Sequence, residues 1–328
     1  MKFDDVWIQG TGRALGELRP VPAKVSDHCG MRSVSWSEQA GPELAVAAGR
    51  QALAAAGDVL PGLHVNGAVG FSGIDLWSAS CWVADQLLGE ALAGLSLQIS
   101  ALCNTSVAGL EMAASMLGGR PDLGRVLITV GDRFPESAVD RFEVDPEIAL
   151  GDGGAAAVLG RGSGLFRLLA CASRTEPAVE GLQRGDEPFR DASPAALGPL
   201  VLRKRTRQFF AAGGRTPASV VTTHVAGVRA VVLEAMAQAG TSVEEARWVI
   251  PPFVGANAFR HGYQVPLGLD QDRTLYELGL RTGHLGGGDH LFALDHLLRE
   301  GLVATGDKVA LVGVGGGMSF SCAVLEAA

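Results

Sequence analysis

The sequence has few cysteines, and none of them are spaced as pairs. The five cysteines, Cys29, Cys81, Cys103, Cys171 and Cys322, lie far apart and include no Cys-x-x-Cys motif. An odd number of scattered cysteines argues against a disulfide framework and a cysteine-ligated zinc site, and it is typical of free thiols in a reducing compartment. We therefore expect a cytoplasmic protein. Its richness in Ala and Gly suggests a bacterial source.

Long apolar runs and basic runs are also missing. No window approaches roughly 18 uninterrupted apolar residues, the length that would predict a membrane span. The amino-terminal MKFDDVWIQG has acidic residues directly after Lys2, where a signal peptide has its apolar region. The net charge is −8, and no run of Lys and Arg marks a nucleic-acid surface. We expect a protein that binds neither a membrane nor a nucleic acid.

What is present indicates a large folded core. The chain has 328 residues, of which 47% are hydrophobic and 19% charged, so it is long and apolar enough for two halves or two domains. Short apolar runs alternate with amphipathic stretches, which predicts an α/β architecture with a largely buried sheet. The predicted strands are 65–71, 126–130, 155–159, 248–250 and 309–314, and the predicted helices are 44–56, 108–117, 219–239 and 291–299.

Two segments of the chain repeat one pattern. Residues 109–131 and 292–314 each read as an amphipathic helix, a Gly-containing turn, a basic residue and a buried strand, and they align without a gap. Each is followed by a Gly-rich turn before another apolar strand, at 151–160 and 315–325. Helix–strand units are common, so chance is one explanation. The other is a duplicated fold, in which the starts of the two matched helices lie close together.

The residues that precede the two matched helices suit acyl transfer. Cys103 precedes the first, and His284 and Asp289 precede the second. A helix amino terminus or a neighbouring imidazolium stabilises a thiolate, its N–H groups can polarise a thioester carbonyl, and a carboxylate can orient a histidine base. Taken singly, each residue also has a structural interpretation: a buried thiol, a structural histidine and a helix cap. His261 and His224 are reserve candidates for the base.

Two further patterns are weaker. Asp289, His290, Asp295 and His296 suggest metal ligands, but Asp/His pairs six residues apart do not share a helix face, so we expect no metal. GTGRALG at 10–16 follows a short strand but lacks the spacing of a dinucleotide-binding loop.

The densest basic stretch is open to two interpretations. Arg203, Lys204, Arg205 and Arg207 form either a solvated helix face or a docking patch for an acidic partner, such as a carrier protein or a phosphorylated cofactor. Segment 174–200 is polar and rich in Pro, which predicts a loop.

Three stretches together resemble the ketoacyl synthase III family of the thiolase superfamily. They are LCNTSVAGLEMAASML with Cys103, GDGGAAAVLG at 151–160 and the terminal GVGGGMSFSCAVLEA. The resemblance covers essentially the whole chain. It implies a five-layered αβαβα fold of two pseudo-symmetric halves, here 1–162 and 163–328, and a homodimer. It also implies that Cys103 is loaded with an acyl group, in an oxyanion hole made by the backbone N–H groups of Cys103 and Gly316.

The chain departs from the condensing members of that family. Those members use Cys, His and Asn, with the His in a Pro-His-Gln-Ala-Asn stretch and the Asn at the start of Gly-Asn-Thr-Ser. Here Pro252 and Phe253 stand where the His belongs, Asn257 preserves the Asn of the first stretch, and Gly283-His284 replaces the second. Condensation needs two hydrogen-bond donors to stabilise the enolate that forms when CO₂ leaves, and this chain lacks the His/Asn pair that supplies them. The GHLGGGD pattern resembles an acyltransferase branch of antibiotic biosynthesis that acylates hydroxyls, often on sugars.

We therefore expect an acyltransferase in which Cys103 takes an acyl group from a coenzyme A or acyl carrier protein thioester. His284, oriented by Asp289, would then activate a small-molecule hydroxyl acceptor. No tightly bound cofactor is expected, and the predicted donor-binding residues are Arg203, Lys204, Arg205, Arg207 and Asn257. The alternatives are a starter-unit ketoacyl synthase that forms a carbon–carbon bond, a non-catalytic partner that binds a carrier protein, and a thioesterase that uses water.

Overall fold

Nine strands form one mixed sheet in the computed structural model, which describes residues 1–189, 200 and 202–328. Their order across the sheet is β5-β4-β6-β7-β1-β8-β11-β10-β9. The strands are β1 (Trp7–Leu15), β4 (Leu63–Gly67), β5 (Ser96–Ile99), β6 (Arg125–Asp132), β7 (Gly153–Gly160), β8 (Phe166–Thr175), β9 (Trp248–Ile250), β10 (Lys308–Gly315) and β11 (Ser319–Ala327). A separate hairpin pairs β2 (Glu17–Pro20) with β3 (Ser33–Trp36).

The helices cover and separate the two halves of this sheet. The longer ones are α2 (Gly41–Ala56), α3 (Ala79–Leu88), α4 (Thr105–Gly119), α6 (Leu202–Ala211), α7 (Pro217–Ala239) and α11 (Asp289–Arg299). The shorter ones are α1 (Ala23–Cys29), α5 (Gly181–Arg184), α8 (Ala256–Phe259), α9 (Val265–Leu267) and α10 (Tyr276–Thr282), with a π-helical turn at Arg260–Gln264 and single 3₁₀ turns at Gly89–Ala91, Pro177–Val179, Gln271–Arg273 and Gly286–Gly288.

The strand order is mirrored about the junction of β1 and β8. Outward from that junction run β7, β6 and β4 on one side and β11, β10 and β9 on the other. Helix α4 leads into β6, and α11 leads into β10, so the two segments that echo each other in the sequence occupy equivalent places. The predicted boundary between residues 162 and 163 lies in the turn between β7 and β8.

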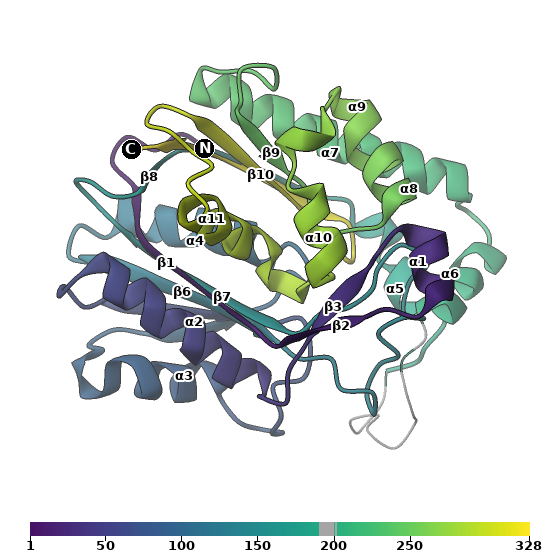
Figure 1. Ribbon diagram of the computed structural model, residues 1–328, viewed down its shortest axis with the longest axis horizontal. Helices are drawn as coiled ribbons and strands as arrows, with labels where there is room; N and C mark the ends of the chain where they lie inside the picture. The colour runs from purple at the N-terminus through teal and green to yellow at the C-terminus, as the bar shows by residue number, and fades with distance from the viewer. Residues whose placement is uncertain (190–199, 201) are drawn as a thin grey trace.

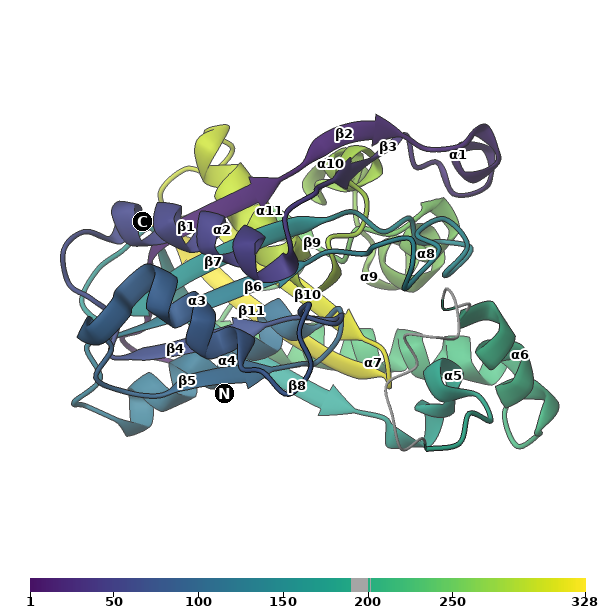
Figure 2. The same cartoon turned by 90° about the horizontal axis from the view of Figure 1, so that it is seen from below.

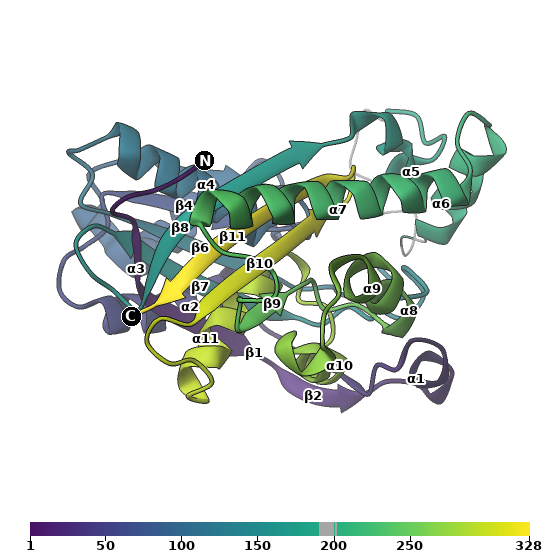
Figure 3. The ribbon, with the colours of Figure 1, turned by 90° about the horizontal axis from the view of Figure 1, so that it is seen from above.

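Five layers are visible in Figure 1, where α4 and α11 lie between the two halves of the sheet. Helices α2 and α3 cover one outer face, and α7 covers the other, which Figure 3 shows from above. The α/β architecture and the five layers expected from the sequence are present. The two β layers are joined, because Ile8 of β1 pairs with Phe166 of β8. Figure 2 shows the small β2–β3 hairpin and α1 projecting at one end.

Helix α2 lies against the sheet on a row of glycines. A Cβ atom at Gly12 would come within 2.1 Å of the carbonyl oxygen of Ala48, and one at Gly10 within 2.1 Å of that of Ala52. Gly154 and Gly131 meet earlier carbonyls of the same helix in the same way. Only glycine permits so close a backbone approach. GTGRALG at 10–16 is therefore not a phosphate loop, because most of it is the inner strand β1.

The predicted elements are found with shifted ends. The strand predicted at 65–71 is β4, which ends at Gly67, and the other four predicted strands correspond to β6, β7, β9 and β10. The four predicted helices are α2, α4, α7 and α11. Helix α7 is long and apolar enough to cross a bilayer by length and composition alone, although its inner face packs in the core against β11 residues such as Phe320. Segment 174–200 contains the end of β8 and the short helix α5, and residues 190–199 lie outside the described part.

The glycine row generates a stability prediction. Gly12→Ala places a methyl group against the Ala48 carbonyl, and we expect it to lower the free energy of unfolding by about 1–3 kcal/mol in urea denaturation. The matched control is Gly118→Ala near the end of α4, where a Cβ atom meets nothing within 4 Å. That change should leave stability equal or raise it by at most about 1 kcal/mol. Equal effects of the two substitutions would contradict the packing argument.

Candidate active site

Cys103 lies in a tight turn between β5 and α4. Its side chain is half-buried, and the residue before it, Leu102, has a left-handed backbone with φ of 49°. The Thr105 hydroxyl donates to the Leu102 carbonyl at 2.6 Å and accepts from the Ala101 N–H at 3.0 Å. A non-glycine residue holds such a conformation only where its surroundings enforce it. Helix α4 begins at Thr105, so Cys103 precedes the helix by two residues and does not belong to its first turn.

His284 is held by its backbone on both sides. Its N–H donates to the Ala149 carbonyl at 2.9 Å, and its carbonyl accepts from the Gly151 N–H at 2.9 Å. The preceding Gly283 has φ of 74°, and a Cβ atom there would meet the Val34 side chain at 2.7 Å. The imidazole is 1% exposed, so its position is set by the chain around it.

Asp289 is the first residue of α11, and its carboxylate is fully buried. One oxygen accepts from the Phe253 N–H at 2.8 Å and lies 2.6 Å from Nδ1 of His284. The other accepts from the Leu285 N–H at 2.7 Å. Two backbone donors and one imidazole donor satisfy a charge that would otherwise be costly to bury. The carboxylate therefore anchors the Phe253 segment and the loop before α11, and it orients His284 at the same time.

The three side chains form one chain of contacts that ends at sulfur. Nε2 of His284 lies 2.9 Å from Sγ of Cys103. Burial alone lowers the pKa of His284, but the charges of Asp289 and Cys103, with their hydrogen bonds, outweigh it and raise that pKa well above its usual value. An imidazolium beside the sulfur favours the reactive thiolate.

Polar contacts across the two halves keep the helix starts together. The Ser106 hydroxyl donates to the Gly287 carbonyl, and the Gly287 N–H donates to the buried Asp132 carboxylate at 2.9 Å. The Asn104 amide donates to the Ser321 hydroxyl of β11 at 2.9 Å. Sequence reasoning missed Asp132, because no local pattern distinguishes a buried carboxylate at a strand end. The prediction that the helix starts meet agrees with these contacts.

The turn at Gly315–Gly317 packs directly on the cysteine turn. A Cβ atom at Gly315 would lie 2.1 Å from the Ala101 carbonyl oxygen, and one at Gly316 would lie 2.5 Å from the Leu102 side chain. In the described part of the chain, the backbone N–H groups of Cys103 and Gly316 donate no hydrogen bond. Both are thus free to bind an oxygen atom.

Gln183 of α5 braces this glycine turn. Its side-chain oxygen accepts from the Gly317 N–H at 2.8 Å, and its carbonyl accepts from the Arg205 guanidinium at 3.1 Å. The contact links the basic helix α6 to the glycine turn through α5. Gln183 was not among the predicted site residues, and a lone Gln in a polar segment carries no signal that would have marked it.

The predicted donor-binding residues divide into two groups. Lys204 and Arg207 are exposed on α6, whereas Arg203 pairs with Glu143 at 3.1 Å and Arg205 is bound to Gln183. Asn257 lies at the start of α8, and its backbone N–H donates to the Glu147 carboxylate at 3.0 Å. The contacts shown for Asn257 are with Glu147, and none of them involves His284 or Cys103.

Among the contacts of the described residues, the other histidines do not touch the sulfur. His261 is exposed in the π-helical turn, and His224 packs edge-to-face on Tyr263 with ring centroids 5.4 Å apart. His290 hydrogen-bonds the Val312 carbonyl at 3.0 Å, and His296 contacts Arg13 at 3.0 Å. Within residues 1–189, 200 and 202–328, no group of three potential ligands could hold a metal ion.

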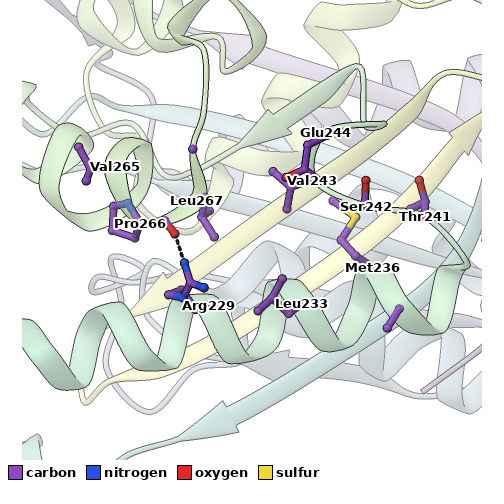
Figure 4. A pocket seen from close by; sticks show the side chains of 12 residues that line it. Arg229, Leu233, Met236, Thr241, Ser242, Val243, Glu244, Val265, Pro266 and Leu267 are labelled. Carbon is purple, nitrogen blue, oxygen red and sulfur yellow. Dashed lines mark hydrogen bonds between the residues drawn. The ribbon is translucent and has the colours of Figure 1, made fainter.

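Neither of two surface cavities in the described part of the chain is lined by Cys103, His284 or Asp289. Figure 4 shows one of about 500 Å³ between α7 and α9, where Arg229 donates to the carbonyl of Pro266. Its lining includes Leu233 and Val265 but none of Cys103, His284 and Asp289.

Two family models match the chain. Residues 97–177 match 3-oxoacyl-[acyl-carrier-protein] synthase III, and residues 236–327 match the carboxy-terminal part of the same family. Curated relatives named beta-ketoacyl-[acyl-carrier-protein] synthase III include one from Sphingopyxis alaskensis, 24% identical over 97% of this chain and 98% of its own. Another, from Clostridium beijerinckii, is 24% identical over 76% of this chain and 72% of its own.

Solved structures agree over the full length. ChlB3, an acyltransferase, has a TM-score of 0.90 at 27% identity, covering 99% of this chain and 98% of its own. The 3-oxoacyl-[acyl-carrier-protein] synthase III of Aquifex aeolicus has a TM-score of 0.77 at 20% identity, covering 98% and 99%. OleA of Xanthomonas campestris has a TM-score of 0.80 at 20% identity, covering 99% and 98%. The chain is a ketoacyl synthase III-like member of the thiolase superfamily, a group of acyl-transferring enzymes.

Proposed function

We propose that this protein is an acyltransferase that moves an acyl group from a thioester, through an acyl-Cys103 intermediate, to a hydroxyl acceptor. The observation that carries the proposal is the unbroken contact chain from Asp289 through His284 to the sulfur of Cys103. It provides a nucleophile, a base and a group that orients the base, which is the logic of nucleophilic acyl transfer.

In the first half-reaction the Cys103 thiolate attacks the donor thioester carbonyl. The negative oxygen that forms accepts hydrogen bonds from the free N–H groups of Cys103 and Gly316. The intermediate collapses by breaking the bond to the donor sulfur, and this leaving thiolate takes the proton from the His284 imidazolium. The products are acyl-Cys103, neutral His284 and the free donor thiol.

The second half-reaction begins from a changed electrostatic state. Acylation removes the negative charge of the sulfur and its hydrogen bond, two of the causes that raise the pKa of His284. That pKa therefore falls, and the neutral imidazole becomes an available base. It takes the proton of the acceptor hydroxyl as the oxygen attacks the acyl carbonyl. The carbon–sulfur bond breaks, releasing the ester and restoring the thiolate–imidazolium pair.

The segment around Phe253 supports transfer over carbon–carbon condensation. Condensation by the related synthases needs a second donor, which in those proteins is a histidine from this segment. Here Phe253 is buried, and its ring packs edge-to-face on Phe292 with centroids 6.4 Å apart. Phe253 therefore offers no side-chain donor for the enolate that a decarboxylating substrate would form.

For the donor we propose coenzyme A or an acyl carrier protein, bound by the basic face of α6. Lys204 and Arg207 are the exposed cations there, and Arg205 connects the helix through Gln183 to the glycine turn. ChlB3, with which the chain shares its whole length, is named as an acyltransferase. From the resemblance of the GHLGGGD pattern to an acyltransferase branch of antibiotic biosynthesis, we propose that the reaction belongs to such a pathway in the bacterial cytoplasm and that the protein is a homodimer.

Intact-protein mass spectrometry tests the intermediate. The wild-type protein, incubated with a panel of acyl-coenzyme A thioesters that includes malonyl-coenzyme A, should gain the mass of one acyl group, and Cys103→Ala should gain none. Cys81→Ala, which removes the exposed thiol, should keep the adduct. His284→Ala should slow loading by about 10²- to 10⁴-fold. Loss of CO₂ with a two-carbon extension of the product would instead indicate condensation, and no adduct from any donor would refute the nucleophile.

The charge coupling between Asp289 and His284 predicts a shift in a pH profile. In a Cys81→Ser background, Asp289→Asn removes the strongest contribution that raises the pKa of His284. The imidazolium then gives up its proton at lower pH, so alkylation of Cys103 by iodoacetamide at pH 6 should slow by about tenfold for each unit by which the pKa falls. Asp295→Asn, the same change of a buried carboxylate in α11, should leave the profile unchanged. Identical profiles for Asp289→Asn and wild type would contradict the coupling.

A further inference from the structure

Tyr263 is a buried tyrosine that the reaction described above does not use. It lies in the π-helical turn at Arg260–Gln264, a rare conformation that is frequent at functional sites. Its side chain is 3% exposed and packs in the core cluster with Val312 of β10 and Phe320 of β11. These two strands are joined by the glycine turn that packs on the cysteine turn, so Tyr263 belongs to a core cluster whose strands extend to the reaction centre.

The ring of Tyr263 is held in one orientation. It packs edge-to-face on the His224 imidazole, with centroids 5.4 Å apart and planes at 85°. His224 in turn packs on Phe320, with centroids 6.0 Å apart. The imidazole also packs closely on Gly262, where an added Cβ atom would lie 2.9 Å from Nε2 of His224.

The hydroxyl of Tyr263 lacks a protein partner. Within the described part of the chain no hydrogen bond is shown for it, and it is not among the fully enclosed polar atoms that lack a partner. The hydroxyl therefore reaches accessible space, where a bound molecule could meet it. Burial, with smaller contributions from the nearby charges of Cys103 and then Asp289, raises the pKa of the phenol, so it stays protonated. The fixed ring thus presents a protonated donor within electrostatic range of Cys103.

We propose that the Tyr263 hydroxyl donates a hydrogen bond to an oxygen substituent of the acyl group on Cys103, close to its thioester carbonyl. The inference rests on the acyl-Cys103 intermediate of the proposed function and adds its substrate class. The enzyme then selects acyl groups with a keto, hydroxyl or carboxylate oxygen near the carbonyl over plain aliphatic ones. A site built around a hydrogen-bond donor disfavours the analogue that lacks the acceptor, because the donor is left unpaired.

The test compares acyl groups that differ by one oxygen. Rates of Cys103 loading are measured by intact-protein mass for acetoacetyl-, 3-hydroxybutyryl- and malonyl-coenzyme A against butyryl-coenzyme A, in wild type and Tyr263→Phe. The ratio of each rate to the butyryl rate, compared between the two proteins, cancels the intrinsic reactivity of the thioesters. The other tyrosine of the chain provides the matched control, Tyr276→Phe.

For at least one oxygen-bearing donor, the ratio of its loading rate to the butyryl rate should be about 10- to 100-fold higher in wild type than in Tyr263→Phe. The butyryl rate itself should be equal or faster in the variant. Tyr276→Phe should behave as wild type. Three results would overturn the inference: unchanged ratios in Tyr263→Phe, an equal loss for every donor including butyryl, or a defect only in transfer from preloaded enzyme to the acceptor. Loading of butyryl alone would refute the oxygen preference and leave acyl-Cys103 intact. No loading from any donor would refute the proposed function itself, and the inference with it.

Discussion

The buried carboxylate of Asp289 is the constraint on which the site depends. A fully buried charge requires several donors, and three converge on it: the backbone of Phe253, the backbone of Leu285 and the imidazole of His284. Meeting these needs fixes the loop before α11, the start of that helix and the ring of His284 together. Because Ser106 and Asp132 then tie Gly287 of that loop to the other half, the sulfur of Cys103 is brought within reach of the imidazole.

The segment around Phe253 lacks the histidine found in condensing relatives, but it has a role in binding Asp289. In condensing relatives the stretch around Phe253 contributes a histidine, whereas here it contributes a backbone N–H to Asp289 and an aromatic ring to the core. The segment is therefore used for support in this chain. A change in two or three residues can alter the available chemistry while the strands and helices around it stay in place.

Periodicity and an internal echo were sufficient to predict the main helices, most buried strands and the meeting of Cys103 with His284. These signals work because a duplicated helix–strand unit leaves the same pattern twice. The role of Gln183, the unpartnered hydroxyl of Tyr263 and the glycine row under α2 could not be predicted this way. Each depends on a contact between distant segments, and no local spacing records such a contact. The strand at GTGRALG was missed for a related reason, since its glycines serve a helix packed on it, not a turn.

The pairing of β1 with β8 has a consequence for access to the sulfur of Cys103. The strands of the two halves belong to one hydrogen-bonded sheet, with α4 and α11 enclosed between its arms. Separating the halves as rigid bodies would break the hydrogen bonds between β1 and β8 and expose the enclosed helices. A hinge motion between the halves is therefore energetically unfavourable. In the proposed reaction, the acyl chain and its acceptor would therefore reach Cys103 through movements of side chains and surface segments while the sheet between the halves stays intact.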